Sequence, residues 1–67
     1  MPIDTESTLE QARRHVVIGE SLVAEQKAIL ERLRSDGHPT RDAERLLDTL
    51  EETLRLMQEH LAHEQSR

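Results

Sequence analysis

One stretch of the chain decides its fold: Ser35-Asp36-Gly37-His38-Pro39-Thr40. Glycine suits the left-handed residue that follows the end of a helix, and proline cannot continue that helix. Because no other segment of the chain combines these two residue types, the sequence predicts one turn, at residues 35–40, between two long helices. We expect Thr40 to cap the second helix with its hydroxyl.

The segments on either side of the turn predict an all-α, antiparallel two-helix hairpin that forms a single domain. Ser7 and Glu10 have the spacing of a capping box, so we place the first helix at 8–34, after an N-terminal tail of residues 1–7. The second helix is placed at 41–64, followed by a C-terminal tail of residues 65–67.

Both predicted helices repeat apolar or small residues at alternating steps of three and four, which is the heptad pattern of a coiled coil. Folding the chain at the turn sets the two rows against each other, and we call them together the hairpin seam. Its members are Leu9, Ala12, Val16, Gly19, Val23, Gln26, Leu30 and Leu33 in the first helix, and Thr40, Ala43, Leu47, Leu50, Leu54, Met57, Leu61 and Glu64 in the second.

A second row, beside the seam and on the same side of both helices, is apolar as well. We call it the outer apolar face, and its members are Ile18, Leu22, Ile29, Leu46, Thr53 and Leu56. A lone hairpin buries only its seam, which is little for a chain this short. The sequence therefore predicts a homodimer in which this face is the interface and four helices pack as a bundle. A higher homo-oligomer and an obligate complex with a different protein are the alternatives.

Charge differs between the two helices. Residues 8–34 carry five positive and four negative side chains, whereas residues 41–65 carry three positive and seven negative. The helices should therefore attract each other. At the polar edge of the hairpin we expect Arg34 to reach Glu44, and Lys27 to reach Glu44 or Glu51.

Two residues interrupt the seam, and each calls for a structural explanation. Gly19 lies within a helix, where it costs about 1 kcal/mol relative to Ala, so we expect a neighbouring helix to approach it closely, through Leu54 or from a second subunit. Gln26 is a polar residue in the seam that can fix the register or the oligomeric state. Thr49 and Thr53 are its expected hydrogen-bond partners.

Composition limits the classes of function. The chain has 67 residues, 34% hydrophobic, with no aromatic residue and no cysteine, and a formal net charge of -5. An acidic chain is a poor candidate for coating nucleic acid, and no apolar run is long enough to span a membrane. The N-terminus lacks the basic and apolar regions of a signal peptide, so we expect a cytoplasmic protein.

The sequence contains few motifs that are associated with catalysis or metal binding. No phosphate-binding loop, nucleophile elbow or paired carboxylate is evident, so we expect no enzymatic activity and no cofactor. His15, His60 and His63 are weak candidates for metal ligands near the open end of the hairpin. A structural or solvent-facing role is the main expectation for these histidines, and a metal-binding or metal-sensing protein is the alternative.

The residues of the turn and of the segment that follows it also resemble those of a known group of proteins. Gly37, His38 and Thr40, followed by Ala43 and the pair Leu46-Leu47, resemble a group of short, uncharacterised proteobacterial helical-hairpin proteins and protein tails. The likeness covers about residues 15–61 and includes His15, Gly19, Gln26, Leu33 and the region of His60. It implies a bacterial cytosolic origin and a place beside regulatory or signalling domains, but no catalytic activity.

From these observations we expect a non-enzymatic, self-associating helical hairpin that acts through protein-protein contacts, as a small regulator or adaptor. Another possibility is an inhibitor of the antitoxin or anti-sigma kind, which would use the acidic surface of the second helix to occupy a basic partner. Neither possibility involves a membrane.

Overall fold

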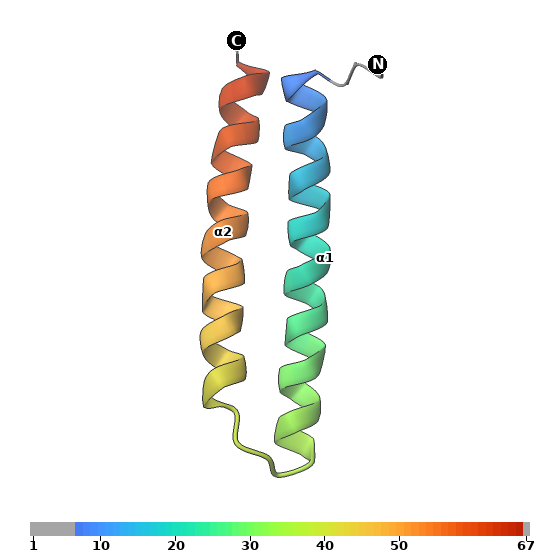
Figure 1. Ribbon diagram of the computed structural model, residues 1–67, viewed down its shortest axis with the longest axis vertical. Helices are drawn as coiled ribbons and strands as arrows, with labels where there is room; N and C mark the ends of the chain where they lie inside the picture. Colours follow the sequence, from blue (N-terminus) through green and yellow to red (C-terminus); the bar gives the residue numbers. More distant parts are fainter. Residues whose placement is uncertain (1–6, 67) are drawn as a thin grey trace, which may run out of the picture.

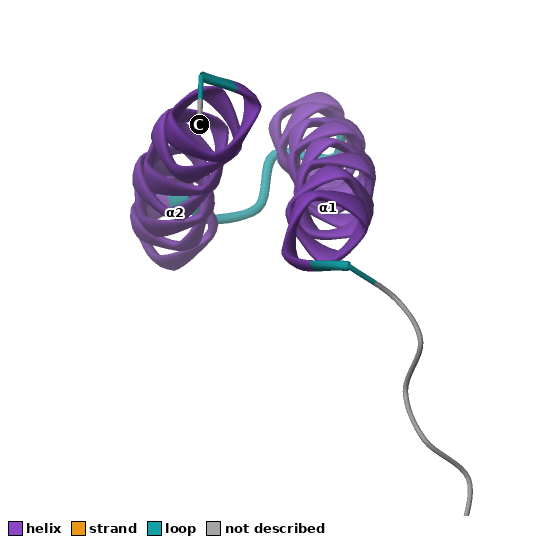
Figure 2. Ribbon diagram, turned by 90° about the horizontal axis from the view of Figure 1, so that it is seen from above, coloured by secondary structure: helices purple, strands orange, loops and turns teal. Residues whose placement is uncertain are grey.

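The chain folds into two helices joined by one turn. The computed structural model describes residues 7–66, with α1 at Thr8–Ser35 and α2 at Arg41–Gln65. The helices run antiparallel and side by side, so the start of α1 and the end of α2 lie at the same end of the hairpin (Figure 1). Seen from above, the described chain forms a single layer of two helices (Figure 2). The predicted hairpin is therefore confirmed.

The helix boundaries differ from the predicted ones by a single residue. α1 extends to Ser35, and α2 extends to Gln65, which the sequence analysis placed in the C-terminal tail. Both helices gain their last residue because a backbone N–H just beyond it still bonds back into the final turn. Of the predicted tails, residues 1–6 and 67 lie outside the described residues.

The start of α1 is fixed by Ser7. Its Oγ accepts a hydrogen bond from the backbone N–H of Glu10 at 3.1 Å, which satisfies one of the donors that a helix N-terminus leaves without an intrahelical partner. The Ser7 hydroxyl also donates to the Glu10 carboxylate at 3.2 Å. These two residues were predicted to form a capping box, and the bond from the Glu10 backbone N–H to the serine oxygen is the central contact of that motif.

The turn after α1 closes with a Schellman arrangement. The backbone N–H of His38 donates to the carbonyl of Leu33 at 2.9 Å, and that of Gly37 donates to the carbonyl of Arg34 at 3.1 Å. This geometry requires a left-handed residue, and Gly37 supplies it with a φ of 75°. Two carbonyls at the end of α1 thereby gain partners, and the chain reverses direction.

Thr40 is the N-cap residue of α2, but the predicted capping bond from its hydroxyl is wrong. The side chain makes no hydrogen bond to the first backbone N–H groups of the helix, and the hydroxyl instead donates to the Glu44 carboxylate at 2.9 Å. The reason lies in the backbone of Thr40, whose ψ of -4° is far from the extended value that Ser7 adopts. The threonine oxygen therefore has its best partner one turn further along α2.

The hairpin seam forms the core as the heptad pattern predicts. On α1, six of its residues are buried: Ala12, Val16, Gly19, Val23, Gln26 and Leu30. On α2 every seam position is only half-buried, and the helix contains no buried residue at all. This asymmetry follows from side-chain size, since small residues on α1 are covered by leucines that project from α2.

α2 approaches α1 closely at Gly19. A Cβ atom added to Gly19 would lie 3.1 Å from Cδ1 of Leu54 and 3.2 Å from Sδ of Met57. The expected close neighbour is therefore Leu54, within the same chain. Both contacts are to flexible side-chain ends, so one methyl group can be accommodated and a larger group cannot.

We expect Gly19→Ala to leave the free energy of unfolding within about 1 kcal/mol of the starting protein, because gained helix propensity offsets a small displacement of Leu54 and Met57. Gly19→Leu should lower it by about 1–3 kcal/mol through overpacking. Urea denaturation followed by circular dichroism measures both. The matched control is Ala24→Leu, at an exposed position of α1. Equal stability of Gly19→Leu and Ala24→Leu would contradict this close approach.

Candidate functional site

The feature of the surface that stands out is the outer apolar face. Its large side chains remain well exposed, at 49% for Ile18, 44% for Leu22, 44% for Ile29, 49% for Leu46 and 53% for Leu56. Thr53 is exposed as well. Single exposed leucines are common in proteins, whereas a contiguous apolar surface marks a site of interaction. Both helices contribute to this surface.

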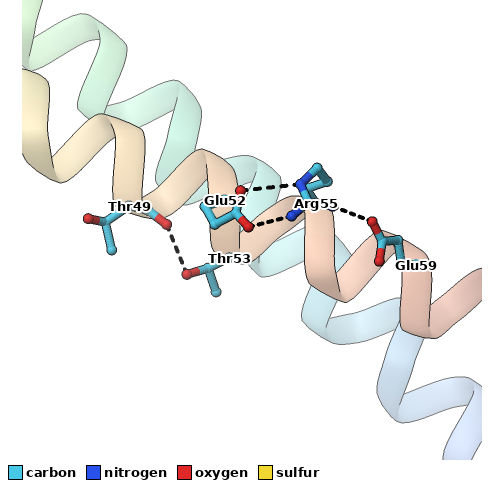
Figure 3. Close-up of polar contacts among 5 residues, drawn as sticks. All are labelled: Thr49, Glu52, Thr53, Arg55 and Glu59. Carbon is cyan, nitrogen blue, oxygen red and sulfur yellow. Dashed lines mark hydrogen bonds and ion pairs between the residues drawn. The ribbon is translucent and has the colours of Figure 1, made fainter.

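The threonines of α2 make the face more apolar than the sequence suggests. The hydroxyl of Thr53 donates to the backbone carbonyl of Thr49 at 2.9 Å (Figure 3), and that of Thr49 donates to the carbonyl of Arg45 at 3.1 Å. Because each hydroxyl is used within its own helix, the threonines need no polar partner from another chain. Thr49, which lies between Leu46 and Thr53 along α2, thus extends the face beyond its predicted members.

Gln26 has a different partner from the one predicted. Its Nε2 donates to the backbone carbonyl of Ala43 at 3.0 Å, so the side chain ties α1 to the first turn of α2. The expected bonds to Thr49 and Thr53 are wrong, because those hydroxyls lie on the outer apolar face and are used by α2 itself. With Gln26 only 7% exposed, this bond helps to fix the register of α2 against α1.

Charged residues surround the face and lie mostly in water. Arg55 binds both Glu52 and Glu59 on the side of α2 that Figure 3 shows away from the threonine pair. The hydrogen bond from Arg55, and then its positive charge, hold the pKa of Glu52 below its ordinary value. The same contacts raise the pKa of Arg55. Because all three groups are exposed, these pairs contribute little to stability.

One of the predicted ion pairs across the hairpin forms. Arg34 lies 3.6 Å from Glu44, as predicted for the polar edge. No ion pair joins Lys27 to Glu44 or Glu51 within residues 7–66, so that expectation is wrong. Glu44 already forms an ion pair with Arg34 and accepts a hydrogen bond from the Thr40 hydroxyl. Lys27 therefore stays exposed to solvent.

The histidines are all exposed, and the hairpin does not assemble them into a cluster. Among the described residues, no group of three or more His, Asp or Glu side chains is placed to hold a metal ion. His15, His60 and His63 therefore do not form one metal site within a single chain. The part of the chain that the structure describes also has no pocket.

Among the described residues, one large apolar side chain that is exposed lies outside every predicted set. Val17 is 60% exposed, and it follows the seam residue Val16, which places it about 100° around α1 from the seam and away from the outer apolar face.

No helix of the described chain is long and apolar enough to cross a membrane.

Comparison of the chain with protein-family models, with curated proteins and with solved structures found no match in any of the three.

We expect Gln26→Glu to lower the free energy of unfolding at pH 7, because an ionised carboxylate cannot donate to the Ala43 carbonyl and is poorly solvated at this buried position. Burial should raise the folded-state pKa of the new carboxyl. The loss should therefore shrink as the pH falls towards 4, where the protonated group can donate again. Urea midpoints at both pH values measure this, with Gln58→Glu on the exposed surface of α2 as the control. A deficit that does not depend on pH would contradict the assignment.

Proposed function

We propose that this protein is a non-enzymatic helical hairpin that self-associates through its outer apolar face and acts through protein-protein contacts. The assembly proposed is a two-fold homodimer with four helices in cross-section. Its role is that of a small regulator or adaptor. The resemblance of the turn region to short proteobacterial hairpin proteins supports a bacterial cytosolic setting beside regulatory proteins.

The observation that carries the proposal is the exposure of large apolar side chains along one side of both helices, interrupted on α1 by Glu25, beside a very small core. The buried apolar side chains are those of Ala12, Val16, Val23 and Leu30 alone among the described residues. A single core in so short a chain rarely supplies more than about 3–5 kcal/mol. Covering the outer apolar face with a second hairpin would remove large aliphatic side chains from water on both copies.

The hydrogen bonding of the face supports the same proposal. The hydroxyls of Thr49 and Thr53 are already bonded within α2, so a partner that covers them leaves no donor without an acceptor. The charged residues of α2 that pair with one another, Glu52, Arg55 and Glu59, lie on another side of the helix and would stay in solvent (Figure 3). These groups therefore add little to the cost of desolvating the face.

We expect the chain to sediment as a dimer at low micromolar concentration, and its melting temperature to rise with protein concentration. Leu22→Glu or Ile29→Glu should raise the dimer dissociation constant by about 100-fold or more, because each copy would bury an unpaired carboxylate. Sedimentation equilibrium measures the mass of each variant, and circular dichroism measures its helicity.

The matched control is Val17→Glu, which makes the same change at an exposed apolar residue of α1 outside the face. Its mass should equal that of the unaltered dimer. A fully helical monomer of the unaltered chain would overturn the proposal. A mass that stays dimeric in Leu22→Glu and Ile29→Glu would mean that another face mediates association. A larger, uniform mass would indicate the higher homo-oligomer.

A further inference from the structure

We infer that the two hairpins of the dimer pair with their turns at the same end, so that α1 of each copy packs on α2 of the other. This inference rests on the proposed self-association and concerns its geometry. It assigns to each residue of the outer apolar face a neighbour in the second copy. It also makes charge, rather than apolar contact, the property that selects the arrangement.

The heights of residues along the hairpin follow from the close approach at Gly19, which lies between the heights of Leu54 and Met57. The long side chains of Gln26 and Arg34 reach Ala43 and Glu44 on either side of this register. In an antiparallel pair with this register, each α1 residue has one α2 residue at its own height. For the outer apolar face and the residues along it, the pairs at equal height are Ile18 with Leu56, Leu22 with Thr53, Glu25 with Thr49, Ile29 with Leu46, and Arg32 with Asp42.

Two flat hairpins that stack face to face by a two-fold axis have two options. An axis parallel to the helices puts both turns at one end and sets α1 on α2 of the second copy. An axis perpendicular to the helices puts the turns at opposite ends, with α1 on α1 and α2 on α2. Neighbouring helices are antiparallel in both options, so the helix dipoles do not distinguish between them.

Apolar contact alone does not separate the options clearly. With the turns together, Ile18 meets Leu56 of the second copy, Ile29 meets Leu46, and Leu22 meets the apolar part of Thr53. With the turns apart, Ile18 can meet Ile29 of the second copy and Leu46 can meet Leu56. In that second option, however, Leu22 of one copy lies at the height of Glu25 of the other. With the turns together, Glu25 of one copy instead meets Thr49 of the other. The option with the turns together therefore keeps the charged carboxylate of the second copy away from Leu22.

Charge favours the option with the turns together. α1 carries five positive and four negative side chains and α2 carries three positive and seven negative, so stacking α1 on α2 pairs a slightly positive helix with an acidic one. Stacking α2 on α2 opposes two acidic helices. Such charges beside an apolar interface set the orientation of helices more than they add affinity.

Arg32 and Asp42 make the preference specific. Both are exposed, and neither has an ion-pair partner within residues 7–66. With the turns together, Arg32 of one copy lies at the height of Asp42 of the other, twice per dimer. With the turns apart, Arg32 instead approaches the height of His15, at the open end of the second hairpin. Only the first option gives both unpaired charges a partner of opposite sign.

Single-cysteine spin labels test the orientation, because the unaltered chain has no cysteine. A label at His38→Cys lies in the exposed turn. With the turns together, we expect the two labels of the dimer to lie within about 30 Å of each other. With the turns apart, they would be separated by roughly the length of α1, about 40 Å for its 28 residues. Pulsed dipolar spectroscopy measures either distance.

A label at Ser21→Cys is the matched control, because Ser21 is exposed and lies near the middle of α1. Both orientations predict a short distance there. Short distances at both sites support the inference. A short distance at Ser21 with a long one at His38 would overturn the orientation while leaving the dimer intact. No dipolar coupling at either site would overturn the proposed self-association itself.

Discussion

The hairpin depends on one steric constraint: two helices placed side by side cover only one narrow strip of each other. The strip on α1 is made of small or slender residues around Gly19, which lets Leu54 and Met57 of α2 come within van der Waals contact of the α1 backbone. The residues of that strip are buried, whereas the larger side chains of α2 stay half-covered. Every described residue outside the strip except Gln11 is exposed, including large aliphatic side chains that a second layer of helices would normally cover.

The polar groups near these apolar rows are satisfied in a consistent way. Gln26 uses a backbone carbonyl of the other helix, and Thr49 and Thr53 use carbonyls of their own helix. Backbone carbonyls have a second lone pair after forming the helix hydrogen bond, so these contacts need no further polar residue. The hydrogen bond of Gln26 helps to fix the register of the two helices in the seam. The hydrogen bonds of Thr49 and Thr53 make the outer apolar face less polar. A surface prepared in this way is suited to contact with another protein.

Charge has a separate role from apolar burial. The first turn of α2 is acidic and the last turn of α1 is basic, which complements both helix dipoles at the turn. The acidic excess of α2 also makes its contact with α1 more favourable than contact with another α2. Exposed pairs such as Arg34 with Glu44 add little to stability, but a difference in sign between helices discriminates strongly among ways of packing them.

The sequence by itself determined the hairpin, the position of the turn, the seam and the exposure of the second row, because these follow from local signals. A glycine with positive φ, a helix-breaking proline and a regular step of three and four act through the chain's own backbone. The partners of individual polar atoms were decided only by the tertiary structure. Gln26 donates a hydrogen bond to the Ala43 carbonyl and not to the threonines. The Thr40 hydroxyl bonds to the Glu44 carboxylate and not to the N–H groups of the helix. Lys27 forms no ion pair with a carboxylate within the described residues. Such choices depend on differences of an ångström in helix height and on competition for the same acceptor, and a periodic pattern carries no information at that scale.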